Sequence, residues 1–179
     1  MPVDSPPRIY LAGPDVFRPD SAEVFARLKA CCERLGLAGL EPEDDGPTGD
    51  AALQGDALAQ RIYEGNVARI QAADGVLANL ADFRGLEPDS GTVFEVGYAI
   101  ALGKPVAAYG VPPGSYAARV GAARPCAPDA QGVLREVADG TMVEGLGQPL
   151  NLMLSRSVGI AGSPEAALQW LAGRLGVRT

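Results

Sequence analysis

The chain has 179 residues, of which 47% are hydrophobic and 21% charged, and its formal net charge is −7. This balance predicts one soluble globular domain over residues 1–179, with a flexible start at 1–7. The negative charge and the lack of a Lys/Arg cluster argue against nucleic acid as a partner. No run approaches the roughly 20 apolar residues of a membrane span. The opening MPVDSPPRIY lacks the apolar segment of a signal peptide, so we expect a cytoplasmic protein.

Hydrophobic periodicity predicts strands and helices in alternation along the chain. In chain order these are a strand over 8–13, a helix over 20–36, a weak strand over 37–42, a helix from 56 to about 72, a strand over 75–80, a helix from about 91 to 102, a strand over 105–110, a short strand over 157–162 and a helix over 163–176. Ser163 is the expected N-cap of the last helix, with Pro164 at its first position. The stretch 111–150 is rich in Pro and Gly, and no element is assigned to it.

This alternation predicts an α/β fold in which a mainly parallel, five-stranded sheet is covered by helices on both faces. In such sheets, ligands bind outside the carboxyl ends of the strands, where the strand order switches. The rule brings together GPDVF (13–17), ADFRGLEPDSGT (81–92) and YGVPPG (109–114). The acidic loop therefore lies at the expected ligand crevice.

Histidine is absent from the sequence, which restricts the chemistry of any site. Ser-His-Asp and Cys-His arrangements are excluded, so acid–base or nucleophilic steps must use Asp, Glu, Lys, Tyr, Cys or Ser. Without His or a CxxC pair, a zinc site is not expected. The odd number of cysteines predicts free thiols in a reducing compartment. Carboxylates are therefore the leading candidates for catalysis.

Glu95 is a carboxylate on a predicted helix that is otherwise apolar. The sequence TVFE (92–95) fits a capping box, in which Glu95 would bond back to the N-cap amide, and taken alone it favours this structural role. Asp89 is likewise typical of a turn or a cap, and Asp74 of a turn. Glu95 and Asp89 share one crevice only if Asp89 stays outside the helix, because six helical residues would separate them by about 240°. Two neighbouring carboxylates are typical of glycosyl transfer.

Four motifs together resemble the nucleoside 2-deoxyribosyltransferases. They are IYLAGPDVF (9–17), N-x7-D-G-V-L-A-N-L (66–80), FRGLEPDSGTVFEVGYAIALGKP (83–105) and VEGLGQPLNLML (143–154). The resemblance is closer to the trypanosomatid and bacterial form than to the lactobacillar enzymes. It implies a flavodoxin-like three-layer fold, a homo-oligomer with shared active sites, and no metal or organic cofactor. The implied partners are nucleosides and free nucleobases.

The resemblance also implies a role for particular residues. Glu95 matches the nucleophile that attacks the anomeric carbon of a 2'-deoxynucleoside, giving a covalent deoxyribosyl-enzyme and transfer to a second base with retention. Asp89 matches the aspartate that holds the sugar hydroxyls. Asp74 matches an aspartate near the base, a candidate proton donor to the leaving nitrogen.

Three further matches each have a structural alternative. Tyr10 matches a tyrosine that positions the glutamate, although a strand tyrosine is often core. Phe17 falls where an aromatic ring packs on the ligand, although it suits a hydrophobic staple as well. Asn151 matches an asparagine often supplied by a neighbouring subunit, or is a loop residue of its own subunit. The apolar residues around it favour a subunit contact.

Parts of the expected site have no assigned partner in the substrate. Asn66 receives no specific role, and for Arg84 we favour an ion pair that holds the acidic loop. Residues 41–56 are expected to cover the base pocket, so the base preference stays open.

Two other functions compete with transfer. A hydrolase would use the same glutamate with water as the acceptor, on deoxynucleosides or their 5'-monophosphates. A nucleoside-binding module would have no turnover. Asp15 in the first turn favours nucleosides over monophosphates, because a phosphate cradle needs backbone amides and no acid.

Overall fold

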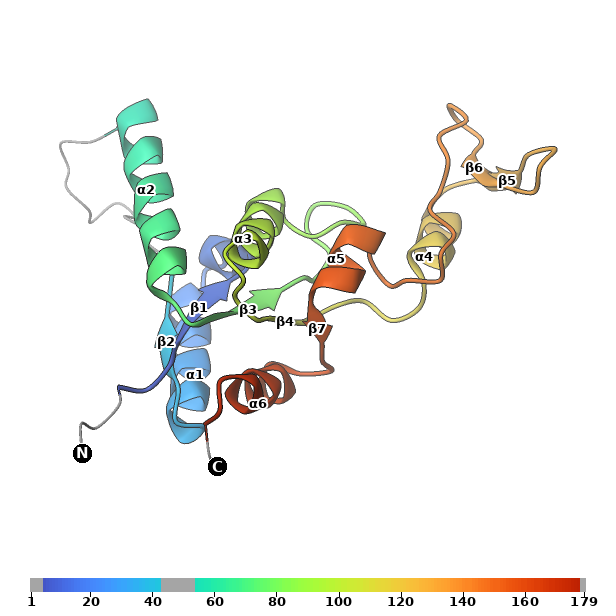
Figure 1. Cartoon of the computed structure of the whole chain (residues 1–179). Coiled ribbons are helices and arrows are strands. Elements are labelled where there is room, and N and C mark those ends of the chain that lie inside the picture. The colour runs from blue at the N-terminus through green and yellow to red at the C-terminus, as the bar shows by residue number, and fades with distance from the viewer. Residues whose placement is uncertain (1–4, 43–53, 178–179) are drawn as a thin grey trace.

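The computed structural model describes residues 5–42 and 54–177. Most of the segment expected to cover the base pocket, and residues 1–4 of the expected flexible start, therefore lie outside the described residues. The main sheet has the order β2-β1-β3-β4-β7, and every strand pair in it is parallel (Figure 1). Its strands are β1 (Arg8–Ala12), β2 (Ala38–Leu40), β3 (Gly75–Asn79), β4 (Val106–Tyr109) and β7 (Gly159–Ile160).

Helices cover both faces of this sheet, because its strands are apolar on both sides. Helices α1 (Ser21–Arg34) and α6 (Pro164–Arg174) pack on one face with Ile9, Leu11 and Leu77. Helices α2 (Asp56–Ala72), α3 (Ser90–Ala101) and α5 (Leu152–Ser157) pack on the other, where Tyr10 points. The prediction of a flavodoxin-like three-layer α/β fold is confirmed.

The unassigned stretch 111–150 forms a projecting arm (Figure 1). It contains α4 (Tyr116–Ala123) and an antiparallel hairpin of β5 (Cys126–Pro128) and β6 (Leu134–Glu136). Three apolar residues of this stretch, Val120, Val143 and Leu150, are buried. The arm therefore has a small apolar base on the body of the protein.

The element ends follow local capping. Ser163 caps α6 by accepting a hydrogen bond from the amide of Ala166, and Pro164 starts the helix, as predicted. Cys31, Cys32 and Cys126 are free thiols. Over the described ranges, the structure contains no helix long and apolar enough to cross a lipid bilayer.

Candidate active site

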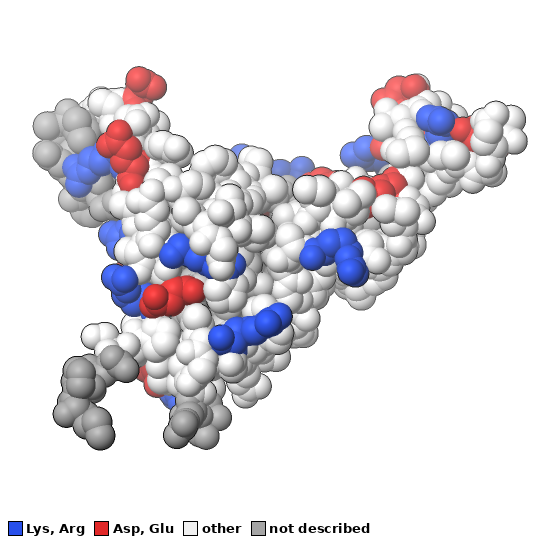
Figure 2. Space-filling view, in the orientation of Figure 1, with Lys and Arg blue, Asp and Glu red and all other residues white. Residues whose placement is uncertain are grey.

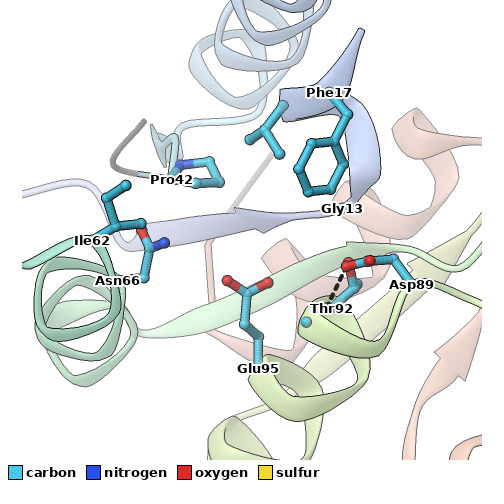
Figure 3. A pocket seen from close by; sticks show the side chains of 10 residues that line it. Gly13, Phe17, Pro42, Ile62, Asn66, Asp89, Thr92 and Glu95 are labelled. Atoms are coloured by element: carbon cyan, nitrogen blue, oxygen red, sulfur yellow. Dashed lines mark hydrogen bonds between the residues drawn. The ribbon is translucent and has the colours of Figure 1, made fainter. Parts of the chain in front are cut away.

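A cavity of about 280 Å³ opens above the carboxyl ends of β1 and β3, between η1 (Pro14–Phe17), α2 and α3. This lies on the crevice that the strand order predicts. Figure 3 shows the carboxyl group of Glu95 pointing into it from α3. The lining residues are Gly13, Val16, Phe17, Pro42, Ile62, Asn66, Asp89, Gly91, Thr92 and Glu95.

Asp89 stands at the start of α3 and caps it. Its Oδ2 accepts hydrogen bonds from the Thr92 amide at 2.9 Å and from the Thr92 hydroxyl at 3.0 Å. Its backbone is extended, with φ −58° and ψ 132°, so it lies outside the helix. This is the condition under which Asp89 and Glu95 share one cavity, and both line it.

The capping-box interpretation of Glu95 is therefore wrong. The helix begins at Ser90, three residues earlier than a Thr92 cap requires, and Glu95 is its sixth residue. A side chain at that depth lies beyond the first turn, where capping and the helix dipole act. The cap that the sequence suggested for Glu95 is made by Asp89 instead.

Glu95 is held by a tyrosine from the sheet. The hydroxyl of Tyr10, a fully buried residue of β1, donates a 2.5 Å hydrogen bond to Glu95 Oε1. Burial raises the pKa of Glu95 to about 7; the Tyr10 hydrogen bond opposes this rise, and the charge of Asp89 adds to it. Burial, followed by the charge of Glu95, also raises the pKa of Tyr10 far above its usual range, so the phenol keeps its proton as a donor. The carboxylate is thus fixed in orientation and poised to titrate near neutral pH.

The opposite wall of the cavity is aromatic. Phe17 is 61% exposed and stacks on Phe83 of the acidic loop, with ring centroids 5.5 Å apart. The Arg84 guanidinium lies over the Phe83 ring at 4.7 Å from its centroid. The ion pair that reaches the acidic loop comes from Arg119 to Asp82, at 2.9 Å, where the sequence had suggested Arg84. Arg84 thus supports the loop through stacking.

Asn66 of α2 lies across the cavity from Asp89, on the side of Ile62 and Pro42 (Figure 3). Sequence reasoning left this residue without a role. The available signal was its position: Asn66 is the first residue of the motif N-x7-D-G-V-L-A-N-L, on a helix that leads into β3. A polar amide between apolar side chains is typical of the groups that orient a ligand in a small-molecule site.

The comparison with known families decides the identity of this arrangement. The model of the family described as nucleoside 2-deoxyribosyltransferase matches residues 9–153. The chain belongs to this family. The match contains the polar lining residues Asn66, Asp89, Thr92 and Glu95, and also Tyr10, which binds Glu95 from the sheet.

Solved structures agree with this membership. A 2-deoxyribosyltransferase from Leishmania mexicana is 34% identical, with a TM-score of 0.73, over 94% of this chain and 98% of that one. A conserved protein from Enterococcus faecalis V583 is 21% identical, with a TM-score of 0.58 over the same shares of the two chains, and supports the fold alone. Among curated proteins, "Uncharacterized protein C191.05c" of Schizosaccharomyces pombe is 36% identical over 104 residues. The match covers 58% of this chain and 49% of that relative, so the chain spans about half of the relative's length.

The structure does not bring Asp74 to the cavity. This residue precedes β3, at the edge of the sheet opposite the carboxyl ends, and it is exposed. Its carboxylate accepts a 2.7 Å hydrogen bond from the Arg8 amide at the start of β1. Asp74 does not line this cavity, because β3 lies between it and the crevice. Its geometry fits a role in strand pairing and argues against proton donation to a bound base.

Asn151 also lies outside this cavity within its own chain. It caps α5 by accepting from the Met153 amide at 3.0 Å, and its Nδ2 donates to Glu144 at 3.0 Å. It lines a second groove, about 600 Å³ in volume, between α3 and α5. Leu150 and Leu154, expected at a subunit contact, are buried in the chain's own core, whereas Leu152 and Met153 are exposed.

Asp15, whose charge was expected to face the ligand, does not line the cavity either. It is 7% exposed and accepts from Asn79 Nδ2 at 2.9 Å and from the Tyr109 hydroxyl at 3.4 Å. These contacts fasten η1 to the ends of β3 and β4. The carboxylates that a substrate phosphate would meet are therefore those of Asp89 and Glu95, which line the cavity.

Proposed function

We propose that the protein is a nucleoside 2-deoxyribosyltransferase that moves 2-deoxyribose between nucleobases, with Glu95 as the nucleophile. One observation carries the proposal: in a chain of this family, a half-buried glutamate at the cavity wall is oriented by a 2.5 Å hydrogen bond from Tyr10. A carboxylate is a competent nucleophile at an anomeric carbon when it is ionised and correctly aimed.

In the first half-reaction, a Glu95 oxygen forms a bond to C1' of the deoxynucleoside while the C1'–N bond breaks. The departing base keeps the electron pair of that bond and gains a proton. In the second, a nitrogen of another base attacks C1', loses its proton and releases Glu95 as a carboxylate. Two inversions give net retention at C1'. The pocket supports this sequence because Glu95 is held from the side of the sheet and faces the open cavity.

We assign the sugar to the end of the cavity with Asp89 and the base to the end with Asn66. Asp89 Oδ2 is engaged by Thr92, which fixes the carboxylate for hydrogen bonding with the sugar hydroxyls. Phe17 offers an exposed ring for stacking, and Ile62 and Pro42 supply apolar contacts for a planar base. Asn66 is assigned a hydrogen bond to the base edge.

We further propose that a second copy completes the site with Asn151. Within one chain, Asn151 and Glu95 line cavities on different faces of α3. The α3–α5 groove is lined by apolar residues such as Val93, Ile100 and Met153, and the surface over α3 is mostly uncharged (Figure 2). Such a face suits a contact between copies, which would bring the asparagine of one copy toward the pocket of its neighbour.

The preferred substrates in this proposal are nucleosides without phosphate. Two of the cavity's ten lining residues are carboxylates, and none of these ten is Lys or Arg. A 5'-phosphate would face this negative field with no cation among them to balance it. We therefore expect kcat/KM at least tenfold lower for 2'-deoxynucleoside 5'-monophosphates than for the matching nucleosides, measured by chromatography of the released base. Equal or higher values for the monophosphates would reverse this assignment.

One incubation tests the main proposal. The protein is mixed with each of the four common 2'-deoxynucleosides, with and without a second free base, and the products are separated by chromatography. Formation of the new deoxynucleoside supports transfer, and it should vanish in Glu95→Ala and persist in the carboxylate control Asp74→Asn. Release of free deoxyribose without exchange would replace transfer by hydrolysis. No turnover would leave a nucleoside-binding protein and refute the proposal.

A further inference from the structure

Arg119 of α4 joins two segments of the proposed site that share no secondary structure. Its side chain is 12% exposed. Nη1 donates to both carboxylate oxygens of Asp82, at 2.9 and 3.1 Å, and to the Leu86 carbonyl at 3.1 Å. Nη2 donates to the Pro149 carbonyl at 2.8 Å. One guanidinium thus binds the acidic loop, residues 81–89, and the segment that leads to Asn151.

The positions of these acceptors matter for the proposed chemistry. Leu86 precedes Asp89 by three residues, and Pro149 precedes Asn151 by two. A second residue of α4 contacts the same segment: the Tyr116 amide donates to the Gln148 carbonyl at 2.8 Å. Interaction with the Glu87 carboxylate raises the pKa of Tyr116 to about 12, so this side chain faces the acidic loop as well. Helix α4 therefore holds both segments at two points each.

The cost of placing an arginine here indicates that the junction is specific. A largely buried guanidinium loses hydration and side-chain freedom, and it is retained only where its geometry is well matched. The planar fork reaches a carboxylate and two carbonyls at once, which a lysine cannot do. The Arg119 Nε is buried and has no hydrogen-bond partner in the part of the chain that the structure describes, so the contacts all come from the two ends of the fork.

The elements around Glu95 do not depend on this junction. Glu95 is held by Tyr10 of β1 and by its place within α3. The acidic loop before Asp89 has no strand or helix of its own. It is held by stacking of the Phe83 ring on Phe17, by a 2.9 Å hydrogen bond from the Phe83 amide to the Glu87 carbonyl, and by the contacts with α4. Loss of the Arg119 contacts should therefore loosen the loop up to Asp89, which then keeps its bonds to Thr92 of α3, and leave Glu95 in place.

We infer that Arg119 is a positioning residue for the sugar subsite, acting through the acidic loop on Asp89. The inference rests on the proposed function for the identity of the ligand. It differs from a simple attachment of the arm, because it predicts a change in substrate binding that is separate from stability and from the titration of Glu95.

The test compares Arg119→Met with Arg124→Met. Arg124 closes the same helix, carries the same charge and pairs with Glu136 inside the arm, at 2.9 Å. Exchange is measured with the deoxynucleoside that the unsubstituted protein turns over fastest, and thermal unfolding is followed for each variant. For Arg119→Met we expect KM to rise at least tenfold, kcat to stay within threefold, and the pH midpoint of kcat to be unchanged. For Arg124→Met we expect KM and kcat within twofold of the unsubstituted protein.

Asp82→Asn is a smaller perturbation of the same junction, because the neutral amide still accepts one hydrogen bond from Arg119. It should raise KM about threefold. If Arg119→Met does not fold, this variant decides, and an unchanged KM overturns the inference. A folded Arg119→Met with KM within twofold, or a loss confined to kcat, also overturns it. Binding of each of the four common 2'-deoxynucleosides to Glu95→Ala, with and without Arg119→Met, is measured by calorimetry. Weaker binding with the second substitution upholds the positioning role even if the unsubstituted protein shows no turnover, which would refute the proposed function alone.

Discussion

Tyr10→Phe is the most direct test of how the pocket prepares its nucleophile. The substitution keeps the ring in the core, where Tyr10 is fully buried, and removes only the hydroxyl that donates to Glu95 at 2.5 Å. A hydrogen bond to a buried carboxylate contributes about 1.5–3 kcal/mol. Because this bond opposes the rise in the pKa of Glu95, its loss raises that pKa further above about 7. The ionised nucleophile becomes scarcer below that pH.

The magnitude follows from the fraction of Glu95 that is ionised. At pH 5.5 to 6, kcat/KM should fall roughly 10- to 150-fold relative to the unsubstituted protein, since about 1.4 kcal/mol corresponds to a factor of ten. The ratio should shrink as the pH rises beyond 7, because both proteins then approach full ionisation. The assay is the initial rate of base exchange from pH 5 to 9 at constant ionic strength, and kcat/KM reports the free enzyme.

Tyr98→Phe is the matched control for this profile. Tyr98 lies on the same helix as Glu95, and its hydroxyl accepts from Gln71 at 2.7 Å, away from the carboxylate. This variant should keep the pH profile of the unsubstituted protein. A Tyr10→Phe loss that is the same at every pH, or no loss at pH 5.5, would refute the argument that Tyr10 stabilises the ionised glutamate.

The remaining predictions concern stability and assembly. Glu95→Gln should abolish exchange and yet increase the free energy of unfolding at pH 8 by about 3 kcal/mol, with no gain at pH 4, as measured by urea denaturation. Burial raises the pKa of Glu95 from its ordinary 4.5 to about 7, so in this pH window the native state holds a proton that the unfolded chain releases. The stability of the unsubstituted protein therefore falls as the pH rises through the window. Equal stability of the two proteins at pH 8 would contradict the proposed burial of the Glu95 charge. Inactive Glu95→Ala and inactive Asn151→Ala chains should regain exchange when unfolded together and reassembled, because some mixed contacts carry both intact residues at one site. Mixed assemblies that never recover activity, or an active monomer in sedimentation experiments, would rule out a shared site.

The sheet and its helices were predictable because their apolar residues follow simple periods. The strands at 8–13, 75–80 and 105–110 are buried on both faces, and a continuous apolar run is what such strands require. The short strand predicted over 157–162 is reduced to Gly159–Ile160, and it lies at the edge of the sheet, where it pairs with one neighbour. Chain connectivity then located the crevice, since the carboxyl ends of parallel strands lie at one edge.

The site was less predictable where it depends on the exact start of an element. The pattern TVFE suggested a cap at Thr92, but Asp89 is the N-cap and accepts from the Thr92 amide. The helix therefore starts three residues earlier, and Glu95 lies in the cavity and not at the cap. Asp74 and Asn66 belong to one motif but lie apart in the structure: β3 separates Asp74 from the pocket, whereas Asn66 lines the pocket from α2. The role of Arg119 could not be predicted, because two of its three partners are carbonyl groups, which leave no mark in the sequence, and the third, Asp82, is 37 positions away.

The placement of the arm has a consequence for how this protein can diverge. The chain leaves the sheet after β4 and returns to β7, the strand beside it, so residues 111–158 can change length without altering any strand register. Helix α4 is restrained by its contacts with the acidic loop, whereas the β5–β6 hairpin beyond it pairs with itself and, through Arg135, with Met142 of the same arm. In related sequences, insertions and deletions should therefore accumulate in the hairpin at 126–136. The contacts of Arg119 with the acidic loop and with Pro149 should be kept. Such insertions and deletions would leave the pocket around Glu95 intact, because none of its lining residues comes from the hairpin.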